Sequence, residues 1–235
     1  MSSKEAVAWF LSFVSALVLI IVIFLTVIEY RSFDLEFFTK EYTKLNNAQV
    51  IGISKQELMQ TTEELLAYIK GERDDLDIQA KIKGQERQVF NQKEIEHMAD
   101  VRMLYFASHK VRNIGFAFFL CLLFGVRLLT GKQYLHYWAR GYLIGGGLMI
   151  GLLIFLAFVI SRNFLWFWDR FHLLIFTNDL WMLNPETDIL IQMVPEQFFF
   201  DLVVSILVLF SGAIMGLGVI AVLIQRRKNK ERFNF

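Results

Sequence analysis

The chain has 235 residues, of which 55% are hydrophobic and 24 are phenylalanine, and its formal net charge at pH 7 is +1. This composition is typical of a membrane protein rather than a soluble domain. The net charge itself indicates nothing about partners, and no nucleic-acid partner is expected. The single cysteine, Cys121, excludes an intramolecular disulfide, and because it lies in an apolar stretch it is not expected to be a reactive thiol.

Four apolar stretches are long enough to cross a bilayer, at residues 6–28, 114–129, 141–160 and 202–224. The first exceeds the usual apolar region of a signal peptide and is not followed by a small-residue cleavage site, so it is expected to remain as an anchor. The sequence therefore predicts an all-α membrane protein built on a four-transmembrane-helix bundle.

Short basic segments indicate how the bundle is oriented. One follows the last apolar stretch and one joins the second and third: Arg226, Arg227, Lys228, Lys230 and Arg232, and Arg127, Lys132 and Arg140. By the positive-inside rule, the 130–140 loop, the 225–235 tail and both termini are expected to be cytoplasmic. Segments 30–112 and 162–200 are then predicted to form a mixed, mostly helical extracytoplasmic cap on a multi-pass cell-membrane protein.

Two capping signals predict helices in the first cap segment. Ser54 and Glu57 form a capping box for a helix over residues 54–70, and Gly71 can end it. Asn91 and Glu94 resemble a second capping box, and the helix that they open can continue to the end of the second apolar stretch. The second span is thus expected to be the top half of a longer, continuous helix.

Two further patterns concern a strand and helix packing. Apolar and polar residues alternate over 78–82, which predicts a strand that turns at Gly84 into a partner near Val89. Glycines in the third and fourth apolar stretches have the spacing that lets helix backbones approach closely: Gly141, Gly145, Gly147, Gly151, Gly212 and Gly216.

The stretch from 171 to 195 is unusual for a connection between two spans. It contains both prolines of the chain and several polar residues, so it is not expected to cross the membrane. It also carries His172 and Trp181 among phenylalanines, followed by an Asn-Pro turn and a Thr-Asp pair. This segment is therefore the first candidate for a functional site.

A second histidine is predicted on the same side of the membrane. His97 precedes Asp100 by three residues, which places an imidazole beside a carboxylate on one helix face. A straight helix would raise His97 by roughly 20 Å above Lys110 at about 1.5 Å per residue, so a tilt or a break is expected near residues 108–113. A histidine in such surroundings is more often structural. His109 is interpreted as part of a polar collar at the outer surface, and His136 as interfacial.

Two segments, EIEHMADVR at 94–102 and FHLLIFTNDLWMLNPETDILIQMVPEQFF at 171–199, carry a resemblance to a known family. Set between four apolar stretches, they resemble the bacterial lipoprotein intramolecular transacylases. The resemblance implies a four-helix membrane bundle with an extracellular cap, and His97 and His172 as the catalytic pair. It implies a diacylated lipoprotein in the bilayer as substrate, whose sn-2 acyl chain moves to the free amine of its first cysteine to give the lyso-form.

The implied reaction suits two imidazoles. Direct attack closes an eight-membered ring, which a confined pocket would favour, and histidine can take the proton of the amine and protonate the departing oxygen. No metal and no cofactor are expected. The supporting and substrate-binding residues are then Asp100 to orient His97, Asn178 to donate to an oxyanion, Phe171, Phe176 and Trp181 as pocket walls, and Asp188.

Other functions lack their signatures in this chain. The GxSxG, HExxH, CxxC and glycine-rich phosphate motifs are absent from the sequence. A phospholipid acyltransferase would need an HxxxxD motif, but the fifth residue after His97, residue 102, is Arg and not Asp. The main alternative is a non-enzymatic membrane sensor or partner-binding protein. The sequence leaves open which histidine is the base, the preferred lipoproteins and acyl length, the oligomeric state and the regulation.

Overall fold

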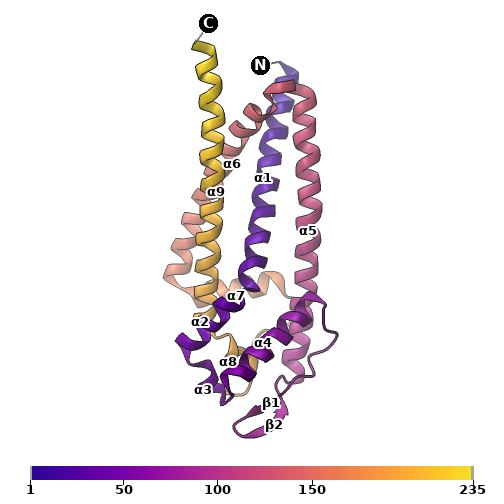
Figure 1. Cartoon of the computed structure of the whole chain (residues 1–235), viewed down its shortest axis with the longest axis vertical. Helices are drawn as coiled ribbons and strands as arrows, with labels where there is room; N and C mark the ends of the chain where they lie inside the picture. The colour runs from indigo at the N-terminus through magenta and orange to yellow at the C-terminus, as the bar shows by residue number, and fades with distance from the viewer. Residues whose placement is uncertain (1, 234–235) are drawn as a thin grey trace. The chain divides into compact units, whose positions relative to one another are not determined.

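The structure, a computed structural model, describes residues 2–233, with side chains up to Arg227, and it is mostly helical (Figure 1). The basic tail residues from Lys228 onward lie outside the described side chains. The elements in order are α1 (Ser3–Ser32), α2 (Leu35–Leu45), α3 (Asn47–Ile51), α4 (Lys55–Lys70), β1 (Gln79–Ile82), β2 (Gln85–Gln88), α5 (Gln92–Thr130), the 3₁₀ turn η1 (Gly131–Gln133), α6 (Tyr134–Arg162), α7 (Phe164–Ile175), α8 (Ile189–Met193) and α9 (Glu196–Phe233).

The chain forms two compact units. Unit 1 contains residues 1–29, 109–161 and 206–235, and unit 2 contains residues 30–108 and 162–205. Among the described residues, three helical stretches are long and apolar enough to cross a membrane, namely Ser3–Ser32, Gln92–Arg162 and Glu196–Arg227. The second of these joins α5, η1 and α6, so it contains two of the four predicted spans.

Unit 1 has a core of aromatic, aliphatic and small residues from α1, α5, α6 and α9. Tyr142 is its largest fully buried side chain, and its hydroxyl donates to the backbone carbonyl of Ile214 at 2.9 Å. The phenol thus joins α6 to α9 and satisfies its own polar atom in an apolar interior, where an unpaired hydroxyl would be costly.

The predicted glycine contacts are only partly present. A Cβ atom on Gly141 would lie 2.7 Å from the backbone carbonyl carbon of Ser12, so α1 and α6 approach closely here because this position has no side chain. Gly145 faces Leu17 at 3.3 Å in the same contact. In contrast, Gly147, Gly151, Gly212 and Gly216 have no such neighbour among the described residues, and the packing role predicted for them is wrong.

The predicted local structure of unit 2 is confirmed. Ser54 caps α4 by accepting the amide hydrogen of Glu57, and the helix ends at Gly71, whose φ of +80° lies in the left-handed region. The strands β1 and β2 pair antiparallel around Lys83 and Gly84, both with positive φ, as in a tight two-residue hairpin turn.

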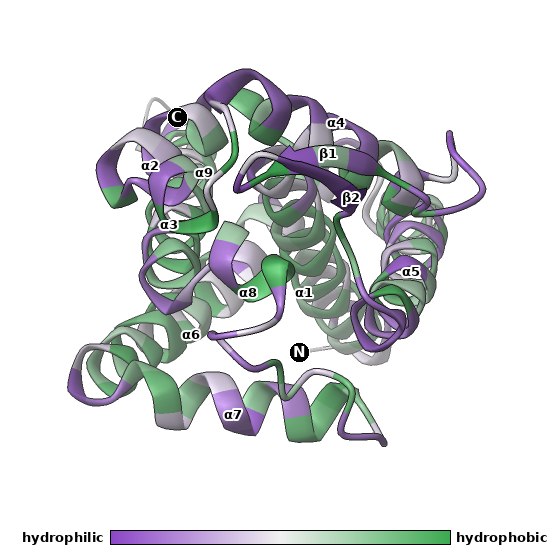
Figure 2. Cartoon of the chain, turned by 90° about the horizontal axis from the view of Figure 1, so that it is seen from below, coloured by the Kyte–Doolittle hydropathy of each residue, from purple (hydrophilic) through white to green (hydrophobic). Residues whose placement is uncertain are grey.

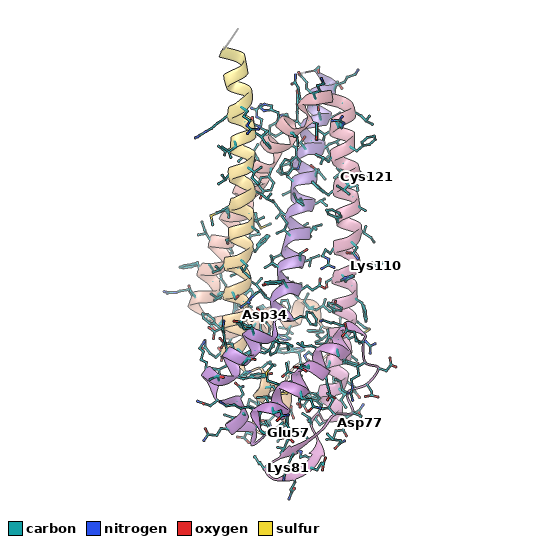
Figure 3. All side chains as sticks on the ribbon, viewed as in Figure 1. Asp34, Glu57, Asp77, Lys81, Lys110 and Cys121 are labelled. Carbon is teal, nitrogen blue, oxygen red and sulfur yellow. The ribbon has the colours of Figure 1, made fainter. Side chains whose placement is uncertain are left out.

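The hairpin is attached to α4 through one carboxylate. Glu57 Oε1 accepts the amide hydrogen of Lys81 at 3.1 Å, and Figure 3 labels both residues. The ribbon of the hairpin is largely hydrophilic in Figure 2, in keeping with the exposed Gln-Glu-Arg-Gln sequence of β2. On the other strand, β1 buries Ala80 and Ile82, so the hairpin adds apolar side chains to the core of unit 2 as well as this polar contact.

Helix α5 removes one of the two alternatives expected near residues 108–113. It runs from Gln92 to Thr130 without interruption, so there is no break, and the tilt stays a prediction. No glycine or proline lies in that stretch to open the hydrogen-bond ladder, which is why the helix continues. The N-terminal part of α5, which carries His97, belongs to unit 2.

Candidate functional site

A capping box positions His97 at the start of α5. The amide hydrogen of Asn91 is accepted by Glu94 Oε2 at 2.7 Å, and the amide hydrogen of Glu94 is accepted by Asn91 Oδ1 at 3.1 Å. His97 follows one turn later on the same helix and is only 8% exposed. The local sequence therefore fixes where the helix begins and turns the imidazole into the interior of unit 2.

His172 lies in the last turn of α7. The helix begins after Asn163, whose side chain accepts the amide hydrogen of Trp166 at 3.0 Å. Nδ1 of His172 lies 2.8 Å from the backbone carbonyl oxygen of Trp168. Because a carbonyl oxygen only accepts, Nδ1 carries the hydrogen, and Nε2 of the neutral ring holds the lone pair.

The two histidines converge within unit 2. Their ring centroids are 6.4 Å apart, and His172 is also only 8% exposed. Phe176 contacts both, with its ring 5.3 Å from that of His97 and 5.8 Å from that of His172. A small polar group could therefore lie between the two imidazoles and accept or donate one hydrogen bond of about 3 Å to each.

Aromatic rings enclose His172 on several sides. Trp181 stacks on it at 4.7 Å with 19° between the ring planes. The rings of Phe171 and Trp168 contact the His172 ring edge-on, with centroid distances of 5.5 Å and 4.8 Å. The predicted aromatic neighbours Phe171, Phe176 and Trp181 thus all contact a histidine, which limits the access of water to the ring nitrogens.

Burial sets the protonation state of both histidines. It lowers the pKa of His97 to about 4; the positive charges of His172 and Lys93 act in the same direction, and Asp100 opposes them. Burial also lowers the pKa of His172, against the hydrogen bond to Trp168 and the charge of Asp169. Both rings are therefore neutral near pH 7, as a proton acceptor must be.

Asp100 and Asn178 form a pair of their own. Asn178 Nδ2 donates to Asp100 Oδ2 at 2.8 Å, and Asn178 Oδ1 accepts the amide hydrogen of Leu180 at 3.1 Å. His97 Nδ1 has no hydrogen-bond partner among the described residues, so Asp100 does not orient His97 by a hydrogen bond as predicted. Asp100 instead holds Asn178, which keeps one amide hydrogen beyond the one it gives to Asp100.

Asp188 stabilises the loop rather than lining the histidine pair. Its carboxylate accepts from Asn91 Nδ2 at 3.0 Å, from Thr187 Oγ1 at 2.9 Å and from the amide of Asn184 at 2.8 Å. The side chain is 6% exposed, so these three donors replace the water it has lost. They connect the loop after α7 to the first turn of α5.

Glu94 extends this connection and was recognised in the sequence only as a helix cap. Its Oε1 accepts the amide hydrogen of Leu190 at 2.6 Å, so the carboxylate also serves the first turn of α8. Glu94 is 1% exposed, and burial raises the pKa of its carboxyl group. One side chain thus joins the helix of His97 to the segment that follows Trp181.

Replacing Glu94 by Ala is expected to destabilise unit 2. Two amide hydrogens would lose their acceptor, that of Leu190 at a buried position and that of Asn91 at a part-buried one, at a cost on the order of 2–4 kcal/mol in unfolding free energy. Thermal or denaturant unfolding, with hydrogen exchange at the Leu190 amide, measures this. Glu94→Gln keeps the shape and one acceptor oxygen, so it should lose less. Equal stability of the alanine variant and the wild type would contradict this role.

Two more contacts at the site were missed by sequence reasoning. Trp168 was not among the predicted site residues, but its carbonyl oxygen lies within hydrogen-bond distance of His172 Nδ1 and its ring packs on Phe164 at 5.6 Å, whereas Trp166 is 51% exposed. The i to i+4 spacing of Trp168 and His172 is the signal that could have indicated the contact. Lys93 donates to the carbonyl of Met182 and so holds the loop near Trp181.

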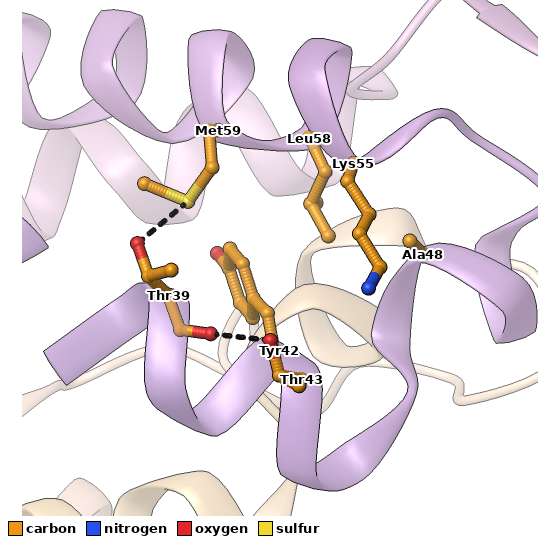
Figure 4. Close-up of a pocket in the computed structure, with 7 residues that line it drawn as sticks. All are labelled: Thr39, Tyr42, Thr43, Ala48, Lys55, Leu58 and Met59. Atoms are coloured by element: carbon orange, nitrogen blue, oxygen red, sulfur yellow. Dashed lines mark hydrogen bonds between the residues drawn. The ribbon is translucent and has the colours of Figure 1, made fainter. Parts of the chain in front are cut away.

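A small pocket elsewhere in unit 2 is not part of this site. It has a volume of about 50 Å³ and is lined by residues of α2, α3 and α4, shown in Figure 4: Thr39, Tyr42, Thr43, Ala48, Lys55, Leu58 and Met59. None of the predicted site residues lines it. Among the described side chains, no group of three or more His, Cys, Asp or Glu could hold a metal ion.

The fold and the paired histidines define a membrane-integral helical protein with a buried, neutral imidazole pair in one of its two units. The family model described as lipoprotein intramolecular transacylase Lit matches residues 13–199, so the chain belongs to this family and is an acyltransferase of lipoproteins. No curated protein matches the chain in sequence.

Solved structures share the fold. The lipoprotein intramolecular transacylase Lit from Bacillus cereus matches with a TM-score of 0.77 and 18% identity, covering 98% of this chain and 100% of that chain. A form of the same protein with a histidine-to-arginine mutation matches with a TM-score of 0.72 and 18% identity, covering 95% and 94%. The expected membrane-integral fold is therefore confirmed.

Proposed function

We propose that this enzyme moves the sn-2 acyl chain of a diacylglyceryl lipoprotein to the α-amino group of the same N-terminal cysteine, with His97 and His172 carrying the protons. The observation that supports this most is the pair itself. Two imidazoles, from helices far apart in the sequence, lie 6.4 Å apart inside one aromatic enclosure. Both are neutral near pH 7, so either ring can accept a proton.

The reaction balances without a further reactant. The amine nitrogen attacks the acyl carbon, the new N–C bond forms, and the bond from the acyl carbon to the glyceryl oxygen breaks. One proton leaves the amine and one reaches the glyceryl oxygen, so the rings return to their starting state after each turnover. Holding the amine next to the ester replaces an improbable encounter in solution, and positioning supplies much of the rate.

Aromatic enclosure supports transfer over hydrolysis. Water that reached the acyl carbon would compete with the amine and release a free fatty acid. Rings of Phe171, Phe176 and Trp181 surround His172 and leave it 8% exposed. The dry surroundings also strengthen the electrostatic interactions of the reacting groups.

The proposed setting of the site is extracytoplasmic. The four apolar stretches at 6–28, 114–129, 141–160 and 202–224 are the enzyme's spans, and the basic segments described above place both termini in the cytoplasm. Segments 30–112 and 162–200, which contain both histidines, are then outside the cell membrane, where lipoproteins are anchored by their acyl chains.

A reporter with one labelled chain tests this function. The purified enzyme is given a synthetic diacylglyceryl-cysteine peptide whose sn-2 acyl group alone carries a stable isotope. Because the transfer is an isomerisation, the product is expected to keep the mass of the substrate, and tandem mass spectra are expected to show the labelled acyl group on the amine. Label that stays on the glyceryl group or leaves as free acid would reject the proposal.

A further inference from the structure

The indole nitrogen of Trp181 is an unsatisfied donor in the middle of the histidine site. Trp181 Nε1 is buried and has no hydrogen-bond partner among the described residues, as is also true of His97 Nδ1. Native proteins pair almost all their buried polar groups, and an unpaired one calls for an explanation. Both atoms belong to side chains whose rings are next to that of His172.

The stacking geometry shows where this donor is directed. The planes of Trp181 and His172 are 19° apart, so the indole N–H, which lies in its own ring plane, runs nearly parallel to the imidazole and does not point at it. A phenylalanine at this position would stack on His172 equally well without burying a donor. Packing against the imidazole therefore does not account for the N–H group.

The backbone around Trp181 is held in place from several sides. Its own carbonyl accepts the amide hydrogen of Leu183 at 2.9 Å, and the preceding turn is closed by Asn178, which Asp100 holds. On the other side, Lys93 donates to the carbonyl of Met182. The ring is thus positioned before any substrate arrives, which is the condition under which a donor stabilises a developing charge most.

We propose that the indole N–H of Trp181 donates a hydrogen bond to the acyl carbonyl oxygen of the substrate during the transfer. This rests on the function proposed above and adds a substrate-binding donor to the two histidines. When the amine attacks, the carbonyl oxygen gains negative charge, and the bond from Trp181 strengthens. The N–H hydrogen stays on the indole, while the proton of the amine goes to the glyceryl oxygen through the histidines.

Removing only the N–H group tests this proposal. Incorporating β-(3-benzothienyl)alanine at position 181 replaces the nitrogen by sulfur and keeps the two-ring shape, and Trp181→Phe gives a second variant without the donor. Both are expected to lower kcat for labelled-acyl transfer by about 10²–10³-fold, with KM for the reporter changed only a few-fold. Trp166→Phe, a matched change on the exposed face of α7, is expected to keep wild-type activity.

The outcomes separate this proposal from the function on which it rests. If the wild type does not move the labelled chain to the amine, the proposed function fails. If the wild type does so and the benzothienyl variant has the same kcat, the N–H group is not used and the Trp181 proposal is overturned. A rise in KM alone, with kcat preserved, would also overturn it, because that is the sign of ground-state packing. Thermal unfolding confirms that each variant is folded.

Discussion

Replacing His97 or His172 by Ala is expected to lower the rate of acyl transfer by roughly 10²–10⁴-fold, the range that a positioned acid or base contributes. The two rings are 6.4 Å apart, so each can serve a different atom of one reacting ester and amine. If they act as a unit, the double variant should be hardly slower than either single variant. The labelled-acyl reporter measures all three.

Two kinds of control separate lost chemistry from lost packing. His97→Phe and His172→Phe retain an aromatic ring in the enclosure and remove only the nitrogens, so they should be as inactive as the alanine variants and better folded. His109→Ala changes a histidine of unit 1 whose ring lies beside Asn113, and it should retain wild-type activity. Wild-type rates in either phenylalanine variant would refute the catalytic pair.

The pH dependence of kcat/KM between pH 7 and pH 5 is expected to show the titration of the substrate amine and no titration of His97. With the pKa of His97 at about 4, its ring stays neutral in this range, whereas the reactive form of the amine is lost as the pH falls. An α-amino group with a pKa near 7.8 predicts a fall of roughly 100-fold, whereas an additional imidazole with an ordinary pKa near 6.5 would make it roughly 2,000-fold. Initial rates measured with the reporter at pH 7 and pH 5 distinguish these two decreases in kcat/KM.

Acid also affects the stability of the folded state, and the lowered pKa of His97 gives the direction of this effect. In the unfolded chain His97 has an ordinary pKa near 6.5, so below that pH the unfolded state binds the proton more readily than the folded state. Its contribution to stability is complete above about pH 6.5 and is lost as the pH falls towards 4. Enzyme held at pH 5 and returned to pH 7 should regain full activity, which separates protonation from denaturation. A ring-nitrogen NMR titration of His97 near pH 6.5 would contradict the prediction.

Local signals in the sequence determined the helix ends and the hairpin. The Ser54–Glu57 and Asn91–Glu94 pairs each satisfy backbone groups within three residues, so nothing distant is needed to start α4 and α5. Gly71 and Gly84 take positive φ angles that few other residues adopt, which ends the helix and turns the strand. The segments at 94–102 and 171–199 also indicated the family, because their residues resemble those of its members.

The tertiary structure alone decided which face of a helix is buried and which distant side chains meet. Trp166 and Trp168 look alike in sequence, but Trp166 is 51% exposed and Trp168 packs on Phe199 of α9 at 4.5 Å. Positions two apart on a helix point about 200° apart, and the fold selects which of the two faces is covered. Asp100 likewise accepts a hydrogen bond from Asn178, which is distant in the sequence, instead of pairing with the nearby His97. The fold, and not the sequence spacing, selects this partner.

The sequence by itself thus determined the apolar stretches, the capped helices and the hairpin, since each depends on residues close together in the chain. It also predicted the two histidines that we propose as the catalytic pair. The tertiary structure decided that these histidines meet, that Trp181 brings an unpaired donor to them, and that Glu94 and Asp188 hold the intervening loop. Such features require side chains from α5, α7 and the loop after it to reach one point, and that depends on packing across 70 or more residues, which periodicity and capping do not encode.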